Sequence, residues 1–205
     1  MPVVQIGKPG ANLDTTKRYN VKLAAGVQGE KRLAEKVLDW AQKKENAPIL
    51  VAFSITSDGK GDIDCIVASG NRLVCIDAKN FSKGYTYGVT KDGKLRRTEG
   101  LGVPRGRSFA KAGGTINTRS QTERFKKVLD ENNLRFKISK PLVVLSPCVK
   151  GGVAIYRDDN WKSAPFSLLQ LDWLENRLDW IFKEDLRPSP SLEKLAHILK
   201  GHAIP

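Results

Sequence analysis

The stretch DIDCIVASGNRLVCIDAKN, residues 62–80, places a two-residue turn signal between two runs rich in strand-forming residues. Gly70 and Asn71 are residue types that adopt the backbone conformation of a tight hairpin turn. The stretch therefore predicts a β-hairpin with strands over residues 62–68 and 72–79, and the rest of the chain has to be arranged around it.

Such a hairpin pairs residues at equal distances from its turn, so Asp64 lies opposite Asp77 and Asp62 lies opposite Lys79. Side chains alternate along a strand, and these four polar residues therefore share one face. The other face is predicted to be core, and its residues are Ile63, Cys65, Val67, Val74, Ile76 and Ala78.

Two directly opposed carboxylates repel each other, by about 3 kcal/mol at an effective dielectric constant of ~20. A divalent cation removes that cost, and Mg2+ prefers one or two carboxylates together with water and phosphate oxygens. We therefore predict a Mg2+ site at Asp64 and Asp77, with Mn2+ able to substitute. Lys79 would hold the attacking water or neutralise charge on a phosphate.

Two alternatives stay open at this point. Asp62 and Lys79 would be an ordinary cross-strand ion pair if Asp64 and Asp77 were simply solvated. A one-residue bulge at the turn would shift the pairing and separate the two aspartates.

The pattern along the whole chain predicts an α/β protein. Residues 1–22 show no periodicity and are predicted to be an N-terminal arm. The predicted helices cover residues 26–44, 118–132, 167–182 and 190–200, the last with Ser189 as its N-cap. Further strands are predicted over residues 49–56, 85–90, 94–97, 141–146 and 153–156. Trp173 and Trp180 are expected in the core, with a homodimer contact as the alternative.

Two polar side chains fall on the apolar stripes of predicted helices. Glu30 precedes Ala34 by four residues, and Gln121 precedes Phe125 by the same spacing. An inward polar group needs a partner, and convergence of both residues on one site explains them together. For Glu30 the alternative is a favourable acid in the first helical turn.

The formal charge of +13 is concentrated in the middle of the chain, where residues 79–140 hold 16 Lys or Arg against five Asp or Glu. This asymmetry favours a nucleic acid partner over a merely solvated basic surface. The predicted phosphate contacts are Arg96, Arg97, Arg105, Arg107, Lys111 and Arg119.

The composition argues against several other classes of protein. The three cysteines form no CxxC pair, and both histidines lie near the C-terminus, so zinc sites, histidine-based nuclease chemistry and a Ser-His-Asp triad are not expected. No apolar run is long enough to cross a membrane, and the N-terminus lacks the features of a signal peptide. We therefore expect a cytoplasmic protein with no membrane partner.

Four motifs resemble those of one family. GVQGE (residues 26–30), DIDCIV (62–67), VCIDAKN (74–80) and the spacing of Asn117 and Gln121 are similar to the nuclease-related domain, NERD, of the PD-(D/E)XK nuclease superfamily. The similarity covers roughly residues 24–146. The departures are a missing proline after Asn117 and a long basic insertion between Lys83 and Asn117.

The resemblance implies a restriction-endonuclease-like fold, a mixed central β-sheet flanked by α-helices. It implies a nuclease core over residues 23–157 with a basic insertion at about 83–116. Outside the resemblance, residues 158–205 are predicted to be C-terminal helices packed on the same domain. The implied catalytic residues are Glu30, Asp64, Asp77, Lys79 and Gln121, with metal held by Glu30, Asp64 and Asp77.

The leading hypothesis is a Mg2+-dependent nuclease that hydrolyses phosphodiester bonds, with DNA as the predicted substrate. The alternative is a catalytically inactive DNA- or RNA-binding module of the same fold. A third hypothesis is a scaffold whose basic face meets an acidic protein.

Overall fold

The hairpin forms around the predicted turn, in which Gly70 has a φ of +56°. The computed structural model describes residues 3–11, 21–57, 61–80, 84–89, 94–102, 110–111, 116–146, 153–156, 164–183 and 186–204. Strands β3 (Asp62–Ser69) and β4 (Arg72–Lys79) pair antiparallel from the turn as far as Cys65 and Ile76. The register predicted from the turn is confirmed over these pairs.

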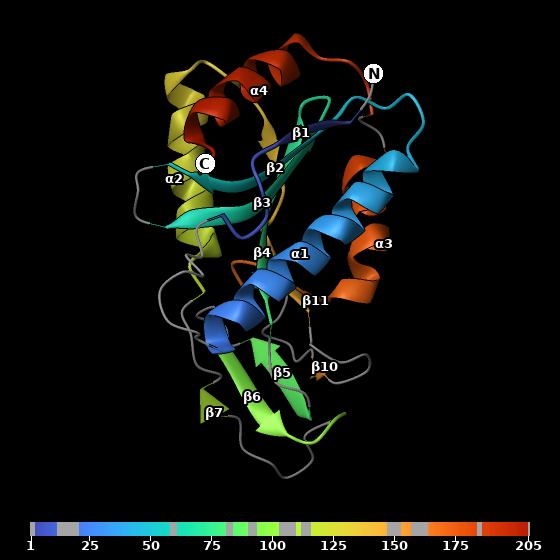
Figure 1. The fold of residues 1–205 in the computed structure, drawn as a ribbon, viewed down its shortest axis with the longest axis vertical. Helices are drawn as coiled ribbons and strands as arrows, with labels where there is room; N and C mark the ends of the chain where they lie inside the picture. Colours follow the sequence, from blue (N-terminus) through green and yellow to red (C-terminus); the bar gives the residue numbers. More distant parts are fainter. Residues whose placement is uncertain are drawn as a thin grey trace.

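The hairpin lies in the middle of a mixed seven-stranded sheet (Figure 1). The strand order is β1-β2-β3-β4-β9-β11, and the short strand β8 also pairs with β4. The added strands are β1 (Val4–Ile6), β2 (Ile49–Thr56), β8 (Lys137–Ile138), β9 (Leu142–Leu145) and β11 (Ser167–Gln170). The pairs β1–β2, β4–β8, β4–β9 and β9–β11 are parallel, whereas β2–β3 and β3–β4 are antiparallel.

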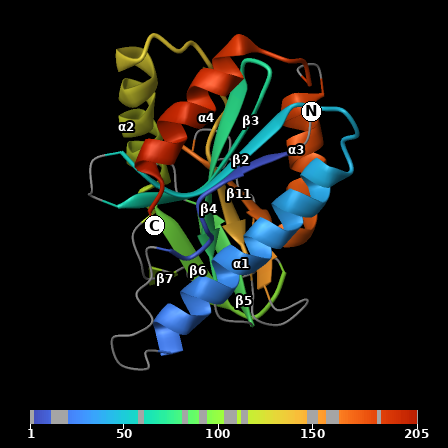
Figure 2. The ribbon, with the colours of Figure 1, turned by 45° about the horizontal axis from the view of Figure 1, so that its top comes forward.

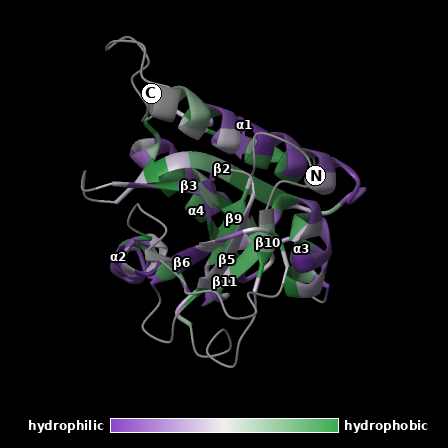
Figure 3. Ribbon diagram, turned by 90° about the horizontal axis from the view of Figure 1, so that it is seen from below, coloured by the Kyte–Doolittle hydropathy of each residue, from purple (hydrophilic) through white to green (hydrophobic). Residues whose placement is uncertain are grey.

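Two helices cover each face of this sheet (Figures 1 and 2). Helices α1 (Val21–Gln42) and α3 (Leu174–Phe182) pack on one face, and α2 (Thr118–Glu131) and α4 (Pro190–His202) pack on the other. Figure 3 shows the consequence, because the central strands are hydrophobic and the outer sides of the helices are hydrophilic. The predicted mixed sheet flanked by helices is confirmed.

A second sheet lies beside the first, with the order β10-β5-β6-β7. Its strands are β5 (Tyr85–Val89), β6 (Leu95–Glu99), β7 (Ala110–Lys111) and β10 (Val153–Ile155). Tyr87 and Leu95 pack in a cluster with Val143 of β9 and Phe166, next to the start of β11. The basic insertion is therefore anchored on the central sheet, close to the end of β4.

Three predictions about elements were wrong. Part of the expected N-terminal arm forms β1, a strand of the central sheet. Helix α1 begins at Val21, five residues before the predicted start. Residues 167–170 form β11 and not a helix, because their pairing with β9 outweighs a helical pattern of leucines; a 3-10 turn (Leu171–Trp173) then leads into α3.

The prediction that Ile63 and Cys65 share one face of β3 was wrong. Cys65 packs against α1, whereas Ile63 packs in the cluster on the opposite face. In the paired strand β2 the alternation of side chains breaks at the same level, because Phe53 packs against α1 and Ile55 packs in the cluster on the opposite face. Between them Ser54 has a φ of +50°, a conformation that breaks the alternation of side chains.

The two tryptophans of the α3 region are exposed, at 60% for Trp173 and 61% for Trp180, so the prediction of core packing was wrong. Leu174, Leu178 and Ile181 occupy the core side instead. The homodimer contact stays a prediction.

Cys65 and Cys75 are buried free thiols, as their setting among β-type residues predicts. No helix in the described ranges has the length and hydropathy to span a membrane.

Candidate active site

The acidic residues gather where β3 and β4 separate. After Cys65 and Ile76, β4 continues alongside β9, so the backbone of Ala78 has no strand partner on the β3 side. The N–H of Ala78 donates instead to Asp64 Oδ2, at 2.7 Å. Asp64 and Asp77 therefore lie at a fork in the sheet.

Helix α1 brings Glu30 to this fork. Gly29 makes the approach close, because a Cβ on it would lie 3.0 Å from the Cβ of Asn80. Asn80 follows the last residue of β4, and its Nδ2 donates to the carbonyl of Ala25 at 2.5 Å. These contacts join the end of β4 to α1 next to Glu30.

Lys79 completes the cluster. Its ammonium lies 2.7 Å from Asp77 Oδ1, an ion pair between residues two apart on β4. The second oxygen of Asp77, Oδ2, is buried and has no hydrogen-bond partner within the described part of the chain. Such an oxygen is costly to bury unless something else binds it.

The three carboxyl groups are buried together, with Glu30 7%, Asp64 9% and Asp77 6% exposed. Burial, and next the charge of Asp62, raise the pKa of Glu30 to about 7. Burial, and next the charges of Asp77 and Glu30, hold the pKa of Asp64 well above its usual range. Without a cation, burial and mutual repulsion therefore disfavour the ionised forms of Glu30 and Asp64.

For Lys79, the neighbouring carboxylates favour the charged form of the side chain. Burial alone would lower the pKa of Lys79, but the charges of Asp77 and Asp64 outweigh it and raise the pKa. The side chain therefore stays an ammonium ion at neutral pH. It can donate hydrogen bonds and neutralise charge, and it cannot serve as a base.

These residues fit a hard divalent cation. The donors are carboxylate oxygens, and the unpartnered Asp77 Oδ2 is an oxygen of the kind that Mg2+ or Mn2+ binds. In the described ranges, no group of three or more His, Cys, Asp or Glu side chains converges closely enough to enclose a metal. Mg2+ does not need such a cage, because it commonly keeps one or two carboxylates and takes water and phosphate oxygens for the rest.

Gln121 reaches the same region from the first turn of α2. Its Nε2 donates to the backbone carbonyl of Asp62 at the start of β3. The contact joins α2 to the strand that carries Asp64, so in the described structure Gln121 holds the strand in position.

The predicted phosphate contacts are spread over several elements. Arg96 is exposed on β6 and is paired in register with Lys111 of β7. Arg97 lies over the ring of Tyr85 at 4.5 Å. Arg119 is exposed on α2 and pairs with Glu123 at 2.7 Å. Arg105 and Arg107 lie outside the described residues.

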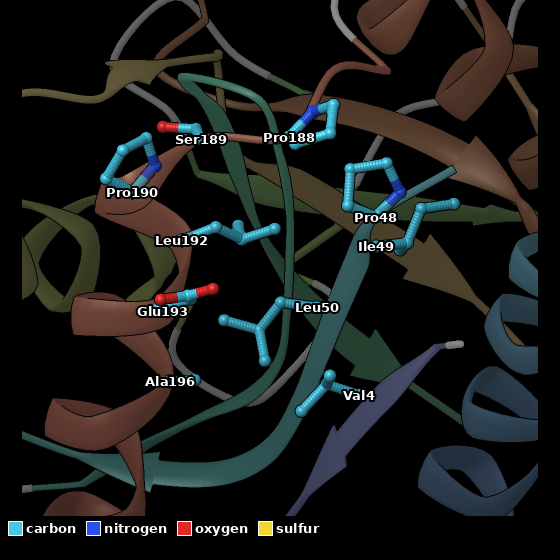
Figure 4. A pocket seen from close by; sticks show the side chains of 10 residues that line it. All are labelled: Val4, Pro48, Ile49, Leu50, Pro188, Ser189, Pro190, Leu192, Glu193 and Ala196. Atoms are coloured by element: carbon cyan, nitrogen blue, oxygen red, sulfur yellow. The ribbon is translucent and has the colours of Figure 1, made fainter. Parts of the chain in front are cut away.

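A separate apolar cavity of about 280 Å3 lies between α4 and the β1–β2 edge (Figure 4). Val4, Leu50, Leu192 and Ala196 line it, with Glu193 as its one acidic residue in the described structure. It contains none of the clustered carboxylates, and we do not assign catalysis to it.

The fold and this cluster define an α/β protein with a lysine-containing acidic site at a fork of its central sheet. The family model described as nuclease-related domain, NERD, matches residues 25–146, more than half of the 205-residue chain. The chain belongs to this family. Comparisons with curated proteins and with solved structures gave no match.

Sequence reasoning missed two contributors to the cluster and the effect of a third. Asp62 was predicted on the same face as Asp64, Asp77 and Lys79, but the action of its charge on Glu30 was not predicted. Asn80 ends the VCIDAKN motif, but nothing in the sequence indicated its contact with Ala25 of α1. Gly10, whose N–H donates to Glu30 Oε2 at 2.9 Å, gave no signal, since no pattern links residues twenty positions apart.

Proposed function

We propose that this chain is a divalent-metal-dependent nuclease that hydrolyses phosphodiester bonds, with DNA as its substrate. The observation that carries the proposal is the group of three buried carboxyl groups beside Lys79, with Asp77 Oδ2 lacking a hydrogen-bond partner among the described residues. Family membership supports a nuclease-related role in general. The metal, the substrate and the catalytic residues are our proposal.

Asp64 and Asp77 would bind the cation directly, and Glu30 would act as the third carboxylate through waters that Mg2+ retains; Mn2+ could replace Mg2+. A bound ion of this kind polarises the scissile phosphate and lowers the pKa of a bound water. Negative charge grows on the phosphate oxygens as water adds to phosphorus. The Lys79 ammonium neutralises that charge, in keeping with its raised pKa.

The basic residues of the second sheet and of α2 hold the phosphate backbone without reading its sequence. Arg96 on β6 and Arg119 on α2 are exposed. Residue Leu95 of β6 packs in a cluster with Val143 of β9, the strand beside β4, and α2 contacts β4 itself.

The test is a cleavage panel with the full chain. Single-stranded DNA, duplex DNA and RNA are each incubated with Mg2+, Mn2+ or EDTA. We expect metal-dependent cleavage of DNA that EDTA abolishes. Asp77→Asn and Lys79→Ala should each reduce it by at least about 100-fold, the usual cost of losing a group that stabilises transition-state charge.

Lys43→Ala is the matched control for Lys79→Ala, because Lys43 is an exposed lysine paired with Glu175 far from the fork. It should cleave like the wild type. Nucleic acid binding without cleavage under every condition would favour the inactive binding module, and cleavage that survives Asp77→Asn would refute the proposed site.

A further inference from the structure

The N-terminal segment that precedes the family-matched region contacts the proposed active site. The backbone N–H of Gly10 donates to Glu30 Oε2 at 2.9 Å. The family match begins at residue 25, so this contact comes from outside it. One oxygen of Glu30 is thereby engaged by the backbone of this segment.

Residues 7–10, which we call the strap, are held in place from both ends. The preceding strand β1 pairs in parallel with β2. At Gly7, with a φ of +71°, a Cβ would lie 2.3 Å from the carbonyl oxygen of Phe53. Only glycine combines that conformation with so close an approach.

The middle of the strap is tied to the kink in β2. Ser54 Oγ donates to the carbonyl of Lys8 at 2.9 Å. The register of β2 and β3 places Ser54 opposite Asp64, since Phe53 pairs with Cys65 and Ile55 with Ile63. The strap therefore contacts β2 at Ser54, which lies opposite Asp64, and it donates a hydrogen bond directly to Glu30.

We propose that the strap positions Glu30 for metal binding, with the Gly10 N–H orienting its carboxylate toward Asp64 and Asp77. This inference rests on the proposed function. In metalloproteins, loss of a hydrogen bond that orients a ligand typically weakens metal affinity by ~10- to 100-fold.

The experiment measures Mn2+ affinity of the full chain by electron paramagnetic resonance and by calorimetry. Gly7→Ala dislodges the strap without touching Glu30. We expect Mn2+ affinity to fall by about tenfold. In a Glu30→Gln background the same change should alter affinity by less than about twofold, because the effect passes through Glu30.

Gly102→Ala is the matched control. Gly102 also has a positive φ, +94°, but a Cβ there would meet nothing within 4 Å. It should carry similar backbone strain and leave Mn2+ affinity unchanged. Should Gly7→Ala fail to fold, Ser54→Ala removes the tie to Lys8, and we expect a roughly threefold loss of affinity from this lesser change.

The outcomes separate the two proposals. A wild-type chain that binds no Mn2+ overturns the metal site and the strap together. A wild-type chain that binds Mn2+, with the same affinity in Gly7→Ala or, where that variant does not fold, in Ser54→Ala, overturns the strap alone. An equal loss in the wild-type and Glu30→Gln backgrounds also overturns it, because the effect then bypasses Glu30.

Discussion

Single residues at the fork set an electrostatic balance that depends on pH. Glu30 has its pKa raised by burial, and next by the charge of Asp62, to about 7 in the folded chain, against an ordinary value of 4.5. The folded state therefore binds more protons than the unfolded state between these two values. The free energy of unfolding must fall as pH rises through this window and stay reduced above it.

Replacing Glu30 by Gln should remove this penalty. Without metal, Glu30→Gln should exceed the wild type in unfolding free energy at pH 8 by an amount on the order of 2–3 kcal/mol, and should match it near pH 4. Urea denaturation at both pH values in EDTA measures the difference. A variant less stable than the wild type at pH 8 would contradict the assigned burial of charge.

Most residues of the candidate site could be predicted from the sequence, but the interactions of Glu30 with Gly10 and Asp62 could not. Asp64, Asp77 and Lys79 follow from alternation along a hairpin, and Glu30 from its place on an apolar stripe. The Gly10 contact and the action of Asp62 on Glu30 depend on how distant segments fold back, and no local spacing records that.

Among the elements, the contact between α1 and β4 decides where Glu30 lies. Gly29 permits it, since a Cβ at this position would meet Asn80 Cβ at 3.0 Å. Alanine favours a helix by ~1 kcal/mol over glycine, whereas overpacking at a close contact costs about 1–3 kcal/mol. The two effects change the free energy of unfolding in opposite directions, but only overpacking pushes α1 away from β4.

Gly29→Ala should therefore reduce metal-dependent cleavage by at least about tenfold, because it pushes Glu30 away from the fork. The net change in unfolding free energy should stay below about 2 kcal/mol. Gly201→Ala in α4 is the control, because a Cβ there meets nothing within 4 Å and activity should be unchanged. Wild-type cleavage by Gly29→Ala would show that the close approach does not position Glu30.

Elements were predictable where one physical signal dominated. The hairpin register followed from its two-residue turn, and α4 begins with Ser189 accepting a hydrogen bond from the Ser191 N–H, as predicted. The kink at Ser54 and the strand β11 were not predictable, because each depends on its neighbours in the sheet.

At the scale of the whole molecule, positive charge is arranged around one end of the central sheet. Arg96 and Lys111 lie side by side on the second sheet, and Arg119 lies on α2. The acidic side chains of α3 instead pair with Lys36 of α1 and with Lys44, just after the end of α1, at Lys36–Glu175 and Lys44–Asp179. The basic surface in and just after α1 is thus partly neutralised.

Nucleic acid binding should depend on salt accordingly. Arg96→Ala should weaken DNA binding equally for all sequences and reduce the slope of log affinity against log salt by about 1. Fluorescence anisotropy in EDTA over a salt series measures both, without interference from cleavage. Lys200→Ala, an equal change of charge on α4, should have no effect on the slope, and equal slopes for all three proteins would refute the assignment.

At the fork between β3 and β4, Asp64 has a structural role in addition to its proposed role in metal binding. Asp64 replaces the missing strand neighbour of Ala78, and without an acceptor there a backbone N–H would be stranded in the interior at a cost of ~1–3 kcal/mol. Architecture alone therefore selects for a side-chain oxygen at residue 64. A relative without the proposed activity could lose Lys79 and would still need Asp or Asn at residue 64 to accept from the Ala78 N–H. An aspartate at this position alone is therefore weak evidence for nuclease chemistry.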